Sequence, residues 1–143
     1  MTPLAFMSSP YTLYEPDIGQ AAADAARLAA RLIETGLHIY SPIVHSHSIA
    51  LLGHLDPMDI AIWYPLNETM LHRCDTLIVA RLPTWEKSKG MAMEIRFFER
   101  KEKPIFDLDV VTLTMTRRTL GVSQELPKAL LRMDDWAGER DIR

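Results

Sequence analysis

The chain has 143 residues, a net charge of −3 at pH 7 and one cysteine, and 48% of its residues are hydrophobic. This size suits a single domain over 1–143, and nothing in the slightly acidic charge predicts the concentrated basic face that a nucleic-acid-binding protein needs. No apolar stretch is long enough to span a bilayer, no secretion signal opens the chain, and the lone Cys74 has no disulfide partner, so we expect a cytoplasmic protein with no membrane or nucleic-acid partner.

The first part of the chain alternates strand and helix signals. Leu4–Ser8 is a short apolar run that ends in a Ser-Ser-Pro turn, which predicts a strand. Residues 17–36 predict a helix that ends at Gly36, and residues 37–43 predict a second strand. The stripe expected to recur on one face of the helix is Ala22, Ala26, Ala29, Ala30 and Ile33.

The next segment is expected to be a loop over 44–56 that carries three histidines. Asp56 followed by Pro57 has the form of an N-cap and a proline at the first helical position. This pair predicts a helix that runs to about Arg73 and is kinked or split at Pro65.

The second half continues the alternation, with a strand over 76–82, a polar loop over 83–89, a helix over 90–103 and a strand over 105–111. The remaining residues predict an extended segment within 112–123, a short helix over 124–135 and a frayed end over 138–143.

This order predicts an α/β fold, a single-domain doubly wound parallel sheet of the flavodoxin or Rossmann type, with four to five strands and helices on both faces. Ligands of such sheets bind beyond the carboxyl ends of the strands. The segments that should form the site are therefore 8–14, 41–47, 83–90 and the residues from 107 onward.

The third of these segments leads into the richest chemical pattern. Ser88 can cap a helix that begins near Gly90, where free backbone N–H groups favour an anion and the missing side chain lets a ligand approach. Glu94 follows one turn later, at a position that we expect to be partly exposed and ionised, because the helix dipole and nearby lysines favour its charge. A helix cap followed by a surface glutamate is the alternative interpretation.

Three blocks resemble the nucleoside 2-deoxyribosyltransferase superfamily. Residues 6–11 (Phe-Met-Ser-Ser-Pro-Tyr) are similar to its opening aromatic strand and turn, and residues 74–80 are similar to its third strand. Residues 88–94 (Ser-x-Gly-x-x-x-Glu) resemble its (Asp or Ser)-x-Gly-x-x-x-Glu signature. The blocks occur in the family's order over roughly residues 4–106, and a subgroup of small bacterial proteins is similar in the loop before Gly90.

The resemblance implies cleavage or transfer at the N-glycosidic bond of a nucleotide or nucleoside. Glu94 would attack the anomeric carbon, the base would leave, and a second base or water would take the sugar. No metal and no cofactor is expected. The residues expected to contact the substrate are Phe6, Ser8, Ser9, Pro10, Tyr11, His45, Asn67, Trp85, Ser88 and Gly90.

Three positions depart from the family. Phe6 stands where transferases often have tyrosine, so one hydroxyl contact to the nucleophile is missing. Ser88 stands where nucleoside transferases have aspartate and nucleotide N-glycosidases have a serine that contacts the 5′-phosphate, which favours a nucleotide. Asn67 stands where an aspartate helps to bind or protonate the base; general-acid help is typically worth about 10²–10⁴ in rate. Glu68 and Asp59 are candidate replacements for that acid.

Two rival functions stay open: a nucleotide-binding module without turnover, and a hydrolase of NAD or of a modified nucleotide. Of the tryptophans, Trp63 is expected in the core and Trp85 near the ligand. The residues 58–64 carry more apolar surface than one helix face can bury, which predicts a homodimer or a higher homo-oligomer.

Overall fold

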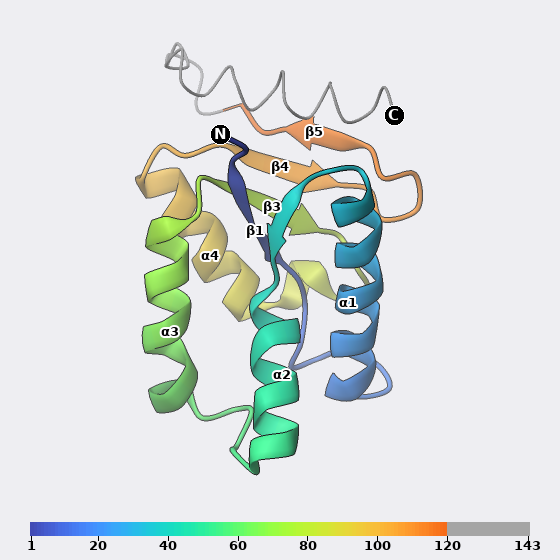
Figure 1. Cartoon of the computed structure of the whole chain (residues 1–143), viewed down its shortest axis with the longest axis vertical. Coiled ribbons are helices and arrows are strands. Elements are labelled where there is room, and N and C mark those ends of the chain that lie inside the picture. The colour runs from blue at the N-terminus through green and yellow to red at the C-terminus, as the bar shows by residue number, and fades with distance from the viewer. Residues whose placement is uncertain (120–143) are drawn as a thin grey trace.

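The computed structural model describes residues 1–119 (Figure 1). The helix predicted over 124–135 and the frayed end predicted over 138–143 lie outside them. The elements are β1 (Leu4–Ser8), α1 (Ile18–Glu34), β2 (His38–Tyr40), α2 (Pro42–Gly53), α3 (Ile60–Arg73), β3 (Thr76–Ala80), the 3₁₀ turn η1 (Trp85–Lys87), α4 (Lys89–Arg100), β4 (Ile105–Leu108) and β5 (Met115–Arg117).

The five strands form one sheet in the order β2-β1-β3-β4-β5. The first four are parallel, and helix α1 packs on one face while α3 and α4 pack on the other. The predicted doubly wound α/β fold is therefore confirmed. At one edge of this sheet, β5 runs antiparallel to β4. The connection over 109–114 is too short for a parallel crossover, so the chain can only turn back.

The sheet has a switch point between β1 and β3. The chain goes from β1 to its neighbour β2 on one side, and then crosses back through α2 and α3 to β3 on the other side. The connections that leave β1 and β3 therefore diverge at their carboxyl ends, where a crevice forms. Figure 1 shows α2 beyond this end of the strands, between α1 and α3.

The two cores are built by the alternation of side chains along β1. Ala5 and Met7 pack beneath α1, whereas Phe6 points to the opposite face and packs against Phe98 of α4. Ser8 continues the series of Phe6, so its hydroxyl is buried on the α4 side. A polar group is thereby delivered to the inner surface of α4 at the end of the strand.

Helix α1 forms where it was predicted, with Asp17 as its N-cap, but it buries a different stripe. Ala26 and Ala30 are exposed, and Ile33 is 52% exposed. Leucine removes more apolar surface from water than alanine does, so the helix rotates to bury its leucines. The buried residues are Ala21, Ala22, Ala25, Leu28, Ala29 and Leu32.

The loop predicted over 44–56 is wrong, because most of it belongs to α2. Ser41 caps this helix by accepting a hydrogen bond from the backbone N–H of Val44 at 3.3 Å, and Pro42 occupies the first turn. Apolar residues lie on all sides of α2, so the sequence shows no helical stripe there. Helix α3 begins at Ile60, later than predicted, and continues through Pro65 without a break.

The other boundaries differ in one systematic way. Strands β2, β3 and β4 each end earlier than predicted, because the chain turns away at the carboxyl edge of the sheet. Strand β5 lies within the extended segment predicted over 112–123. In the part of the chain that the structure describes, no helix combines the length and apolar character needed to cross a membrane.

Candidate functional site

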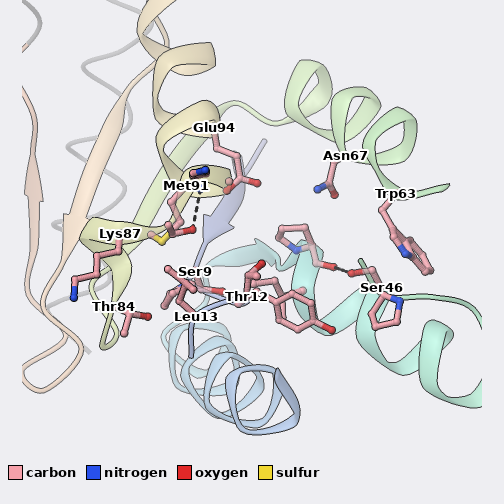
Figure 2. A pocket seen from close by; sticks show the side chains of 18 residues that line it. Ser9, Thr12, Leu13, Ser46, Trp63, Asn67, Thr84, Lys87, Met91 and Glu94 are labelled. Carbon is pink, nitrogen blue, oxygen red and sulfur yellow. Dashed lines mark hydrogen bonds between the residues drawn. The ribbon is translucent and has the colours of Figure 1, made fainter. Parts of the chain in front are cut away.

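A cavity of about 390 Å³ opens at the carboxyl ends of β1 and β3 (Figure 2). Its walls come from the segment after β1, from α2 and α3, and from the loop that leads into α4. Three of the four segments predicted to form the site therefore meet here. The fourth, from Asp107 onward, instead lines a separate cavity of about 550 Å³.

Glu94 lies on α4 and lines the first cavity, although its side chain is only 7% exposed. The hydroxyl of Ser8 donates a hydrogen bond to Oε1 of Glu94 at 2.6 Å. This contact follows from the alternation on β1, which turns Ser8 toward α4. Within residues 1–119, no side chain or backbone group is hydrogen-bonded to the second carboxylate oxygen, so this oxygen can serve a ligand.

Burial raises the pKa of Glu94 to about 7, against the opposing effect of the hydrogen bond from Ser8. The expectation of a partly exposed, readily ionised carboxylate is therefore wrong. The helix dipole acts mainly within the first turn, and Glu94 is the sixth residue of α4. Because the two protonation states have similar populations near neutral pH, Glu94 can act as a base or nucleophile when ionised and as an acid when protonated.

One end of the cavity is the start of α4. Ser88 caps the helix, and its Oγ accepts a hydrogen bond from the backbone N–H of Met91 at 3.2 Å, which leaves the hydroxyl proton free to be donated. Lys87 and Lys89 line the same end and are exposed. A side chain built on Gly90 would meet nothing closer than Oγ of Ser88 at 3.9 Å, so internal packing does not require glycine there. This end suits an anion.

The other end of the cavity is formed by α3. Trp63 and Asn67 lie four residues apart and therefore share one face of the helix. The indole N–H of Trp63 donates to the backbone carbonyl of Asp56 at 2.8 Å, which fixes the ring. Figure 2 shows these two side chains on one side of Glu94 and Lys87 on the other. The cavity thus has a cationic end, a central carboxyl group and an aromatic, uncharged end.

The model of a family described as a domain of unknown function, DUF1937, matches residues 4–110. The chain belongs to the DUF1937 family. The matched range runs from β1 through β4, so the family match covers every residue that lines the cavity. No curated protein matches the chain.

The DUF1937 fold brings together most of the residues that the sequence singled out. Ser8 does not line the cavity, but it is hydrogen-bonded to Glu94, which does. The predicted residues that line the cavity are Ser9, Pro10, Tyr11, Asn67, Ser88, Gly90 and Glu94.

Three predicted contact residues lie elsewhere in the DUF1937 domain. Phe6 is fully buried between Tyr40 and Phe98, because its position on β1 faces the core. His45 is exposed on α2 and does not line the cavity; its ring lies 5.8 Å from that of Tyr40. Trp85 packs on the α4 core beneath the guanidinium of Arg81 at 4.9 Å.

The two tryptophans therefore exchange their predicted roles, since Trp63 lines the cavity and Trp85 does not. The spacing of Trp63 and Asn67 on one helix is the signal that could have identified Trp63. Thr12, Ser46 and Thr84 also line the cavity and were missed. All three lie in segments predicted to form the site, but no motif distinguishes them there.

The remaining chemical groups near the cavity are few. The Tyr11 hydroxyl and Nδ1 of His47 are hydrogen-bonded at 2.7 Å, and burial raises the pKa of Tyr11. Asp59 caps α3 and Glu68 is exposed, and neither lines the cavity. Within residues 1–119, no group of three or more His, Cys, Asp or Glu side chains is placed to hold a metal ion.

Proposed function

We propose that this protein cleaves or transfers the N-glycosidic bond of a nucleotide or nucleoside, with Glu94 as the nucleophile. The observation that carries the proposal is a buried carboxyl group, held by Ser8, at the centre of the cavity. A cavity of about 390 Å³ is within the usual range for small-molecule sites. Along the cavity, the cationic end, the carboxyl group and the aromatic end follow one another in the same order as phosphate, sugar and base in a nucleotide.

In this mechanism Ser8 orients the carboxylate through Oε1, and the other oxygen attacks the anomeric carbon of the sugar. The bond from that carbon to the base nitrogen breaks, and a glycosyl ester of Glu94 forms. Water or a second base then attacks the same carbon and restores the carboxylate. A desolvated carboxylate is more basic than one in water, which favours its use as a nucleophile.

The start of α4 favours a nucleotide over a nucleoside. Ser88 has a hydroxyl proton to donate, and Lys87 and Lys89 supply positive charge around free backbone N–H groups. Charge-assisted hydrogen bonds of this kind are worth roughly 1.5–3 kcal/mol each. A 5′-phosphate at this end would place the sugar beneath Glu94.

The test is incubation with a panel of nucleotides, deoxynucleotides and the matching nucleosides, with free base measured by chromatography. Turnover should fall at least about a hundredfold in Glu94→Gln, the low end for a positioned catalytic group. Glu99→Gln is the matched control, because Glu99 lies on the same helix and is exposed. Tight binding without any base release would instead favour a nucleotide-binding module.

The apolar surface of α2 and α3 bears on the assembly of the protein. Helices α2 and α3 expose many large apolar side chains, among them Leu52 at 81% and Ile60 at 74%. Burial of such a surface against a second copy would remove apolar area from water, so we propose a homo-oligomer built on these helices. A cytoplasmic location stays a prediction.

A further inference from the structure

The cavity is short of acids. Among the described residues that line it, Glu94 carries the only carboxyl group, and the other ionisable side chains are Tyr11, Lys87 and Lys89. At the aromatic end, Asn67 offers an amide, which cannot give up a proton as a carboxylic acid does. Glu94 itself cannot serve, because the same group must be ionised to attack the sugar.

Tyr11 is a poor source of the missing proton. Its hydroxyl is already hydrogen-bonded to His47, and burial raises its pKa above the ordinary value of 10.0. A departing purine or pyrimidine that is neutral in the nucleotide leaves with an extra electron pair and has to be protonated. The described cavity therefore lacks a group suited to help an ordinary base to leave.

The cavity does contain groups that stabilise a positive charge. The indole N–H of Trp63 is bonded to the carbonyl of Asp56, so the ring itself is what this residue offers a ligand. An aromatic face attracts a cation, and the attraction grows when water is excluded. The carboxylate of Glu94 adds a negative charge between this end and the lysines.

We propose that the substrate is a nucleotide whose base is cationic, such as a pyridinium or an N-alkylated purine nucleotide. This inference rests on the proposed function and narrows its substrate class. The phosphate lies at Ser88 and the lysines, the anomeric carbon at Glu94, and the cationic ring over Trp63. The uncharged amide of Asn67 hydrogen-bonds the ring or its substituent.

The step then balances without an acid. An oxygen of the Glu94 carboxylate bonds to the anomeric carbon, the bond to the ring nitrogen breaks, and its electron pair neutralises the positive ring. The base leaves as a neutral molecule. Water attacks the glycosyl ester, the carboxylate is restored, and one proton is released to solvent. The sum is cationic nucleotide plus water giving neutral base, sugar 5-phosphate and a proton.

The test uses two matched pairs: nicotinamide mononucleotide with its reduced form, and 7-methylguanosine 5′-monophosphate with guanosine 5′-monophosphate. Each pair differs in the charge of the ring. With the full-length protein, chromatography should show base release from the cationic members with kcat/KM at least ~100-fold greater, the low end of general-acid help. Asn67→Asp, which adds a carboxyl group of the same shape, should speed release of guanine about tenfold or more and leave the cationic members unimproved.

Binding gives a readout that does not depend on how easily each base leaves. In the Glu94→Gln variant, which does not consume the ligand, calorimetry should show that Trp63→Leu weakens binding of nicotinamide mononucleotide roughly tenfold and that Trp63→Phe restores most of it, while binding of the reduced form changes little. Release of guanine within tenfold of 7-methylguanine, or an equal loss for both forms in Trp63→Leu, overturns the inference and leaves the proposed function standing. No base release from any of the four overturns both.

Discussion

Glu94→Gln should stabilise the protein at alkaline pH while it abolishes turnover. The folded protein holds the Glu94 proton up to a pH of about 7, whereas the unfolded chain releases it near the ordinary value of 4.5. The free energy of unfolding therefore falls as the pH rises from 4.5 through 7. At about 1.4 kcal/mol per pKa unit, the rise from 4.5 to about 7 costs about 3 kcal/mol once the pH exceeds 7.

Glutamine keeps the shape and can still accept the hydrogen bond from Ser8, but it never takes on the charge. Urea unfolding at pH 8 should thus show Glu94→Gln to be more stable than the native protein by about 3 kcal/mol, a shift in Tm on the order of 10 °C. At pH 4.5 or below, the two should be nearly equal, and titrations that they share cancel in the difference. A difference that does not change between these pH values would refute the buried, protonated carboxyl group.

Three further changes and one pH profile test other parts of the site. Gly90→Ala should raise Tm, because no atom lies closer than 3.9 Å to the added Cβ and alanine favours a helix by up to about 1 kcal/mol. The same change should weaken 5′-monophosphate binding in calorimetry, and unchanged binding would mean that no ligand approaches Gly90. Ser88→Ala should reduce the preference for 5′-monophosphates over nucleosides by roughly tenfold. Equal affinity of the native protein for both would refute the proposed phosphate-binding site. The kcat/KM of the native protein should rise with pH and level off above about 7, because Glu94 must be ionised to attack; a rate that is flat from pH 5 to 8 contradicts this. Leu52→Glu should lower the mass measured by light scattering. The control Val111→Glu should not, because Val111 is also 81% exposed but lies outside α2 and α3. A monomeric native protein would refute the proposed interface.

The sequence was most informative where one local signal settled the structure. The strand at Leu4–Ser8 needs only a run of apolar residues, and the helix cap at Ser88 needs only one side chain near the backbone. Both are found as predicted. The sequence was least informative where packing decides between similar options. Helix α2 has apolar residues all round, so no pattern could identify it before its neighbours were placed.

The candidate site shows the same division. The positions of Gly90 and Glu94 follow from a short motif and the order of the elements. The pKa of Glu94 could not be predicted, because it depends on how completely the folded chain buries the carboxyl group. The exchange of Trp63 and Trp85 has the same origin, because only the packing of the folded chain places Trp63 on the cavity wall and Trp85 against the α4 core.

The alternation along β1 also limits how this site can change in evolution. A substitution at Ser8 alters one contact to the carboxyl group, but the loss or gain of one residue within β1 would turn every following side chain of the strand to the opposite face. Ser8 would then point toward α1, and a core residue would take its place beside Glu94. Deletions and insertions in this strand therefore destroy the site and are not tolerated. New specificity must arise by point substitutions or in the loops that surround the cavity.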